Sequence, residues 1–266
     1  DSSIDLQQTS KCYESLSILI EWCGAVVVDD QVLQTAGKAF TSELPCFNDD
    51  DKKDDLELVF NLAQEVFMQA INALQDMAFQ KLQTAEFQTK QNISYFDLFF
   101  KLAESKSKSM KNYGLQILAE IVGETPDGQI PSLFLERLFE IAANEAMEGN
   151  CFGFHAIKKL ACSSSFNTSY SENIKSLIPK MVQRLYSNSP YTPEPDPTHT
   201  TESTMVANDN CVNALGSILM NIFGDNLVES FNIFDVDEDL KVPVLLVILS
   251  AMPPKIDFAE NESIME

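Results

Sequence analysis

Apolar residues recur along most of this chain at three- and four-residue spacing, which is the spacing of one face of an α-helix. Leu16, Leu19, Ile20 and Cys23 show this spacing near the start of the chain, and residues 215–222 repeat it near the end. The alternation of polar and apolar residues that is typical of a half-buried strand is almost absent. The pattern therefore predicts a chain built from α-helices.

Glycine, proline and acidic residues divide this pattern into about eleven predicted helices. Their spans are 10–28, 31–44, 56–82, 93–103, 107–122, 129–147, 149–161, 172–187, 204–223, 240–251 and one that begins at 257. The β-branched residues between 242 and 248 would also suit a buried strand. Pro243 near the start of that segment and the helical patterns on both sides of it favour a helix.

Every second predicted helix shares one pattern, a polar start followed by small residues at packing positions and long aliphatic residues between them. Segments 109–118, 149–157 and 209–219 show it most clearly. These second helices begin near residues 11, 56, 109, 150, 207 and 257, at intervals of 45, 53, 41, 57 and 50 residues. A small residue at one recurring position lets a neighbouring helix approach closely. Since the aliphatic stripe is too wide for one partner, each helix is expected to lie between two neighbours.

HEAT and armadillo repeats have periods of about 40 to 47 residues, close to these intervals. The chain is therefore predicted to be all-α, an α-α superhelix of the HEAT-repeat type with about five helix pairs, running as one continuous array over residues 1–266. Two insertions account for the longer intervals, an acidic loop at 48–55 and a proline-rich loop at 188–203. Each falls between the two helices of a pair, at an edge that faces solvent in such a stack.

The charge indicates which partners are favoured. There are 40 Asp and Glu residues against 18 Lys and Arg, which gives a formal net charge of -22. A surface of this sign repels phosphate, so nucleic acid and anionic membranes are poor partners, whereas basic peptides and proteins are attracted at long range. No stretch reaches the ~18 apolar residues that span a bilayer, and no secretory signal pattern begins the chain, so a cytosolic or nuclear protein is expected.

Residues that would carry catalysis or hold a metal are few and isolated. The histidines, His155 and His199, have no second ligand at metal-binding spacing, and no glycine-rich phosphate loop is present. The segment 235–239 begins like a calcium loop but lacks the glycine and the final acid that such a loop needs. No catalytic residue, cofactor or metal site is predicted, and the chain is expected to be a binding scaffold and not an enzyme.

Two groups of apolar residues are expected in the core. The cysteines lie in apolar helical patterns without a C-x-x-C pair and are predicted to be reduced thiols that pack as small hydrophobic residues; they are Cys12, Cys23, Cys46, Cys151, Cys162 and Cys211. The aromatic cluster Tyr95, Phe96, Phe99 and Phe100 has helical spacing and is most simply core, with a hydrophobic pocket for a partner as the alternative.

The second helices resemble a known family. The segment Asp209–Ile218 is similar to a helix of the importin-beta (karyopherin-beta) superfamily, closest to the importin-five class of nuclear import receptors. In that class the next helix ends in a Trp-Leu-Pro or Cys-Leu-Pro element followed by an acidic stretch, and here Ala251-Met252-Pro253 precedes Asp257-Phe258-Ala259-Glu260. The acidic insertion before Leu56 also falls where that class has one. The resemblance covers residues 10–266 and is firmest from Met110 onward.

The resemblance implies a eukaryotic carrier that shuttles between cytoplasm and nucleus. Such a carrier binds basic nuclear-localisation segments of cargo proteins and releases them when the small GTPase Ran binds in its GTP form, with nucleoporins as further partners. Complete receptors are several times longer, so the chain is expected to be a carboxy-terminal piece, and a monomer. The alternative is a structural HEAT scaffold of a phosphatase or kinase complex, but the irregular spacing and the two inserts favour the importin type.

Partner contacts are expected from the acidic residues and from polar residues of the second helices, which line the inner face in that family. Two interpretations of the acidic loop are open, an electrostatic attractor for basic partners and an ordinary solvated loop. On helix 204–223 the polar side is expected at the surface. The expected contact residues are Asp49, Asp50, Asp51, Asp54, Asp55, Lys111, Asn150, Asp209, Asn210, Asn213, Ser217, Asp257 and Glu260.

Overall fold

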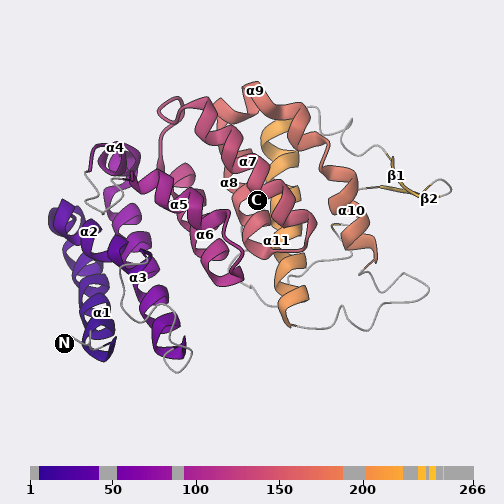
Figure 1. Cartoon of the computed structure of the whole chain (residues 1–266). Helices are drawn as coiled ribbons and strands as arrows, with labels where there is room; N and C mark the ends of the chain where they lie inside the picture. Colours follow the sequence, from indigo (N-terminus) through magenta and orange to yellow (C-terminus); the bar gives the residue numbers. More distant parts are fainter. Residues whose placement is uncertain are drawn as a thin grey trace. The chain divides into compact units, whose positions relative to one another are not determined.

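A computed structural model describes residues 6–41, 53–85, 93–187, 202–223, 233–237, 240–243 and 248. These residues form α-helices α1 to α11 and one short antiparallel hairpin (Figure 1). The chain divides into two compact units, unit 1 at Asp1–Ile130 and unit 2 at Pro131–Glu266. The all-α, helical-repeat fold class predicted from the apolar spacing is confirmed.

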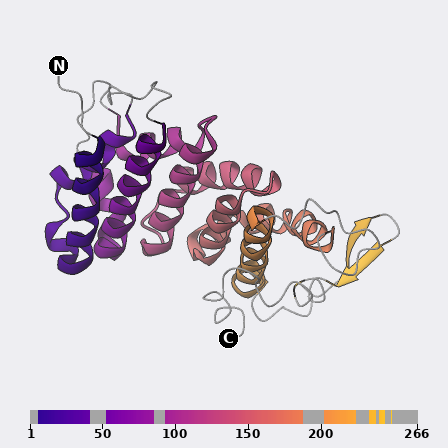
Figure 2. The same ribbon diagram turned by 90° about the horizontal axis from the view of Figure 1, so that it is seen from below.

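Unit 1 contains the first six helices. Its elements are α1 (Leu6–Cys23), a 3-10 turn (Gly24–Val27), α2 (Asp30–Ala39), α3 (Lys53–Leu74), a second 3-10 turn (Gln75–Met77), α4 (Ala78–Thr84), α5 (Tyr95–Ala103) and α6 (Lys108–Glu124). Helix α3 packs against both α1 and α6, while α2 packs on α3 and α5 on α6. Figure 2 shows α1, α3 and α6 standing side by side. These are the predicted second helices, so the expectation that such a helix lies between two neighbours is confirmed for α3.

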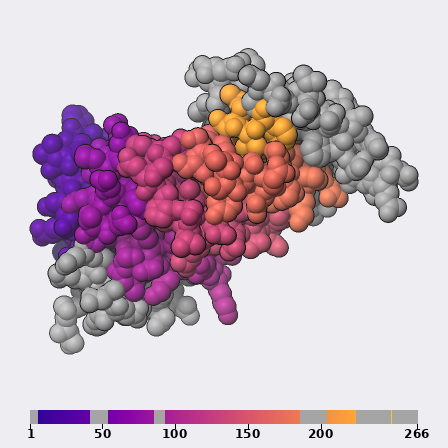
Figure 3. All heavy atoms as spheres, turned by 90° about the horizontal axis from the view of Figure 1, so that it is seen from above, coloured from indigo at the N-terminus to yellow at the C-terminus, as the bar shows by residue number. Residues whose placement is uncertain are grey.

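Unit 2 contains the remaining elements. They are α7 (Ser132–Met147), α8 (Cys151–Cys162), α9 (Ser164–Lys175), α10 (Ile178–Ser187), α11 (Glu202–Ile218), a π-helical turn (Leu219–Phe223), β1 (Ile233–Asp237) and β2 (Leu240–Pro243). Helix α8 packs against α7 and α11, and α11 also contacts α10. In the space-filling view the orange atoms of α11 adjoin those of the earlier helices of unit 2 (Figure 3).

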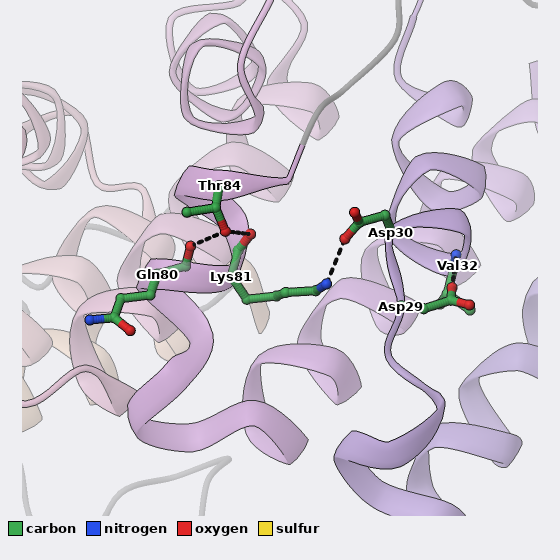
Figure 4. A network of polar contacts seen from close by, with 6 residues as sticks. All are labelled: Asp29, Asp30, Val32, Gln80, Lys81 and Thr84. Atoms are coloured by element: carbon green, nitrogen blue, oxygen red, sulfur yellow. Dashed lines mark hydrogen bonds and ion pairs between the residues drawn. The ribbon is translucent and has the colours of Figure 1, made fainter.

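Side-chain caps fix where several helices begin. The Asp29 carboxylate accepts a hydrogen bond from the Val32 amide at 2.9 Å at the start of α2. The next residue, Asp30, pairs with the Lys81 ammonium of α4 at 2.5 Å, and in α4 the Thr84 hydroxyl donates to main-chain oxygens one turn back (Figure 4). The start of α2 is thereby tied to α4 as well as to its own first turn.

Glycine allows the closest helix approaches in both units. A Cβ on Gly114 of α6 would lie 2.3 Å from the Ala103 main-chain nitrogen of α5. A Cβ on Gly153 of α8 would lie 2.5 Å from the Ala146 nitrogen of α7. The predicted role of the recurring small residue in the second helices is confirmed at these two positions.

An aromatic cluster fills the interior of unit 1. Phe67 of α3 is fully buried, and its ring centroid lies 5.0 Å from that of Phe99 and 5.9 Å from that of Tyr95, both in edge-to-face contact. Phe100 is buried as well, whereas Phe96 is half-buried and stacks on Phe79 of α4. The core interpretation of this cluster is confirmed for its three buried members.

Two predicted helix boundaries were wrong. The predicted helix 56–82 is interrupted at Gln75, whose φ of 46° ends α3 before α4 begins. No glycine or proline marks this break, and the apolar spacing continues across it. The break predicted at 163–165 is confirmed at Ser163 alone, because Ser163 caps α9 by accepting a hydrogen bond from the Phe166 amide at 3.4 Å, and the next helix begins at Ser164 and not at 172. The predicted helix 172–187 is therefore the end of α9 together with α10.

The predicted helix 240–251 was also wrong at its start. Residues 240–243 form β2, which pairs antiparallel with β1 in the register Ile233↔Pro243, Phe234↔Val242 and Asp235↔Lys241. The prediction relied on helical neighbours, but the neighbour that matters is β1, which supplies the main-chain partners that a β-branched segment needs. Apart from Ile248, the rest of that predicted helix lies outside the described residues.

Candidate functional site

Polar side chains join the three parallel second helices of unit 1 into what we call the polar ladder. Its contacts run from α1 to α3 and from α3 to α6, each between side chains of two neighbouring helices. The ladder residues are Ser17, Glu57, Asn61, Gln64, Glu65, Ser109, Tyr113 and Gln116.

Hydroxyl groups supply most of the donors of the ladder. The Ser17 hydroxyl donates to the Glu65 carboxylate at 3.0 Å, which joins α1 to α3. Between α3 and α6, the Ser109 hydroxyl donates to the Glu57 carboxylate at 3.3 Å and the Tyr113 hydroxyl to the Asn61 side-chain oxygen at 2.6 Å.

The third contact between α3 and α6 joins two amides. The Gln64 Nε2 donates to the Gln116 Oε1. Each of the three α3–α6 pairs links residues 52 apart in sequence, so the two helices are in the same register along the ladder. The sequence signal was present in the 53-residue interval between the predicted helix starts at 56 and 109, but the individual ladder residues were not predicted.

The acidic side chains of the ladder remain open to a partner. Glu57, Asn61 and Glu65 are exposed, whereas Ser17 and Tyr113 are buried behind them. A carboxylate has about four lone-pair positions, and the hydroxyl contacts occupy one on each glutamate. The serine donors, buried Ser17 and half-buried Ser109, therefore orient the glutamates while leaving acceptor positions for a lysine or arginine of a partner.

Burial and a neighbouring acid both keep Tyr113 in its protonated form. Burial raises the pKa of Tyr113 to about 12, and the charge of Glu57 contributes to the increase. At neutral pH the phenol is therefore protonated and donates its hydrogen bond to the Asn61 side-chain oxygen. The site is an array of acceptors in a negative field, which suits cationic groups and not anionic ones.

More acids lie on α1 and α3. Asp54 and Asp55 are exposed in the first turn of α3, and on α1 the exposed Glu14 and Glu21 are one turn away from Ser17 in either direction.

No protein-family model, curated protein or solved structure matches this chain. The acidic face of α1 and α3 is thus the feature of the described structure that most directly indicates a class of partner.

Asp54 and Asp55 were expected in the acidic loop 48–55, but α3 already begins at Lys53. Acids are favoured in the first turn of a helix because the exposed amides there carry partial positive charge, which explains the earlier start. Asp49, Asp50 and Asp51 of the same loop lie outside the described residues, as do Asp257 and Glu260 and most of the proline-rich loop 188–203.

The predicted contact residues Lys111 and Asn150 lie at the starts of their helices. Lys111 is half-buried in the first turn of α6. The Asn150 side chain caps α8 by accepting a hydrogen bond from the Phe152 amide at 3.1 Å, and its Nδ2 donates to the Glu145 carboxylate at 3.2 Å. Asn150 thus has a structural role that accounts for its presence.

The expectation that the polar side of α11 lies at the surface was wrong for two of its four residues. Asp209 and Asn213 are 4% and 3% exposed. Among the described residues, neither the oxygen nor the nitrogen of the Asn213 amide has a hydrogen-bond partner. Asn210 is half-buried and donates to the Val206 oxygen at 3.0 Å, and Ser217 is half-buried one turn after Asn213. Helical spacing identified a polar stripe but not which element covers it.

The prediction that the cysteines pack as small hydrophobic residues is confirmed for one cysteine and wrong for three, and Cys46 lies outside the described residues. The described cysteines are free, but only Cys211 is buried, where burial raises the pKa of its thiol. Cys12, Cys23 and Cys162 are exposed. Within the described part of the chain, no group of three or more His, Cys, Asp or Glu side chains could hold a metal ion, and no helix is long and apolar enough to cross a membrane.

Proposed function

We propose that this chain binds basic protein segments along the polar ladder, and that it does so as a nuclear transport receptor of the importin-beta type. The observation that carries the proposal is the row of exposed acids on α3, Glu57 and Glu65, each of which accepts a hydrogen bond from a serine hydroxyl of a neighbouring helix. Lysine and arginine side chains of an extended segment would bind these two carboxylates along α3.

The charge of the whole chain supports the same class of partner. A formal net charge of -22 raises the rate at which basic proteins are encountered, and the effect weakens as salt screens it. The exposed acids Asp54 and Asp55 extend the negative face along α3. A scaffold for acidic partners would not carry this distribution.

The transport role itself is supported by the resemblance of residues 209–218 to an importin-beta helix and by the acidic insertion before Leu56. Under this proposal the cargo is a protein with a basic nuclear-localisation segment, Ran in its GTP form releases it, and the receptor works in cytoplasm and nucleus. Irregular repeat intervals favour this role over a regular phosphatase or kinase scaffold.

The test is a titration of the purified chain with a fluorescent peptide rich in lysine and arginine, followed by fluorescence anisotropy at several salt concentrations. The ladder variant is Glu57→Gln with Glu65→Gln. Since each exposed ion pair contributes up to about 1 kcal/mol, it should bind about three- to tenfold more weakly at low salt, with a smaller dependence on salt.

The matched control is Asp76→Asn with Glu140→Gln, which removes the same charge from exposed positions outside the ladder. It should change affinity less than twofold. Equal losses in the two variants would show that the binding follows net charge alone, and the ladder would not be the site.

Ran loaded with GTP, but not with GDP, should then release the peptide from the parent chain. If peptide binding depends on the ladder but Ran-GTP releases nothing, the transport role fails and the scaffold alternative remains.

A further inference from the structure

Helix α1 has apolar side chains on two opposite faces, and only one of them is covered. The covered face packs on the rest of unit 1 and consists of Leu6, Ser10, Tyr13, Ser17 and Ile20. The other face bears the α1 stripe, which we define as Ile18, Leu19, Trp22 and Val26. Their exposed fractions are 50%, 45%, 83% and 92%.

The α1 stripe covers the end of the helix and the turn that follows it. Ile18 and Trp22 lie one turn apart on α1 with Leu19 beside them, and Val26 follows in the 3-10 turn after Gly24, whose φ of 67° ends the helix. The four side chains present on the order of 500 Å² of apolar surface, since an aromatic side chain alone presents about 150 to 250 Å². That area is at the upper end of the largest apolar patches of monomeric proteins, and such patches mark interaction sites.

One edge of the stripe is acidic. Glu14 and Glu21 are exposed and lie one turn before and one turn after Ile18, so their carboxylates border the stripe along one side. It is the side nearer Ser17, where α1 joins the polar ladder. The stripe is thus an apolar row with a negative edge.

From these features we infer that the α1 stripe is the docking site for a helix of another protein, one with an apolar face and lysine or arginine along one edge. An apolar helix face of this kind fits the ridge of a second helix, and the same helix α1 already packs in this way on α3. The basic edge of the partner would lie over Glu14 and Glu21. The inference does not depend on the proposed transport role.

Charge argues against a second copy of this chain as the occupant. Two α1 stripes related by two-fold symmetry would each bring an acidic edge to the contact, and each chain carries a net charge of -22. The stripe is also smaller than the roughly 800 Å² that each partner buries in a stable protein interface. The docked helix is therefore expected to bind reversibly, with a dissociation constant in the micromolar range.

Trp22 allows a direct test because it is the one tryptophan of the sequence. In the free chain its fluorescence should resemble that of tryptophan in water. A synthetic helical peptide with a Leu and Phe face and a lysine edge should shift the emission to shorter wavelength in a saturable manner. A peptide with the same apolar face and a glutamate edge should bind at least tenfold more weakly, and one with alanine in place of the apolar residues should produce no shift.

Variants separate the stripe from the rest of the surface. Ile18→Ser with Val26→Ser should weaken binding of the lysine-edged peptide at least tenfold, and Glu14→Gln with Glu21→Gln should weaken it about threefold and reduce its salt dependence. The control is Leu133→Ser, an equally apolar side chain that is 77% exposed on α7 and should leave binding within twofold of the parent. Because all these side chains are largely exposed, the circular dichroism spectra should not change.

Three results would overturn the inference. Short-wavelength emission from the free chain at every concentration would show that the stripe is covered within the chain. A shift that grows with chain concentration, together with a doubled mass in sedimentation, would identify a second copy as the occupant. Equal binding of the lysine-edged and glutamate-edged peptides would show that the acidic edge plays no part.

Discussion

Replacing Gly114 with alanine should destabilise the chain even though alanine is the better helix former. Gly114 lies in the middle of α6, where a Cβ would meet three main-chain atoms of α5: the Ala103 nitrogen at 2.3 Å, the Phe99 oxygen at 2.6 Å and the Ala103 Cα at 2.9 Å. Main-chain atoms within a helix cannot rotate away as the end of a side chain can. The added methyl group must therefore push α5 away from α6 by about 1 Å.

Two opposing terms set the magnitude. Alanine gains about 1 kcal/mol over glycine in a helix interior. Overpacking a closely packed contact costs about 1 to 3 kcal/mol. A clash with three main-chain atoms belongs at or above the upper end of that range. We expect a net loss of about 2 kcal/mol, which corresponds to a melting temperature lower by roughly 4 to 8 °C for a chain of this size.

Gly216→Ala is the matched comparison. A Cβ on Gly216 of α11 meets no atom of the described residues within 4 Å, so only the gain in helix propensity remains, and the melting temperature should rise by about 2 to 4 °C. Gly153→Ala should lower the melting temperature as Gly114→Ala does, because its Cβ would lie 2.5 Å from the Ala146 nitrogen. The change in each variant is measured by thermal and urea unfolding followed by far-ultraviolet circular dichroism. If Gly114→Ala and Gly216→Ala shift the midpoint in the same direction by similar amounts, the close approach of α5 and α6 is refuted.

Three further predictions concern single side chains. Burial raises the pKa of Tyr13 to about 12, with a contribution from the charge of Cys12. The free energy of unfolding should therefore fall by up to about 2 kcal/mol as the pH rises from 10, where the unfolded tyrosine ionises, to 12. Tyr13→Phe should flatten this pH dependence in urea unfolding, and an unchanged pH dependence would contradict the prediction. Asn150→Ala removes the cap that accepts the Phe152 amide and should lower the free energy of unfolding by about 1 kcal/mol, most of which Asn150→Ser should restore; equal stability of the alanine variant and the parent would argue against the cap. Asn213→Leu replaces a buried amide that has no hydrogen-bond partner in the described part of the chain, and it should raise the melting temperature; a lower melting temperature would show that the amide is paired.

Much of the fold could be predicted from local pattern. The second helices predicted to begin near 11, 56, 109, 150 and 207 correspond to α1, α3, α6, α8 and α11, and the small residues at Gly114 and Gly153 mark real close approaches. These features are readable because an amphipathic helix repeats every 3.6 residues whatever it packs against. The break at Gln75 and the strand at 240–243 were missed because neither has a local marker strong enough to outweigh its surroundings.

The site was predicted less well, for a related reason. Local spacing placed Asn213 on a polar stripe, but its burial depends on residues distant in sequence, and the same holds for the contact of Glu57 with Ser109 and of Glu65 with Ser17. Equally, nothing local shows that Trp22 is exposed, because an apolar residue in a helical pattern is by default expected inside.

The sequence by itself determined the all-helical class, the order of the repeats and the acidic character that favours basic partners, since composition and periodicity are properties of the chain alone. Only the tertiary structure decided which polar residues face one another across α1, α3 and α6, and which apolar face of α1 is left open. The physical reason is that a helix offers several faces at once, and the register in which its neighbours pack selects the face that is covered and the face that can bind.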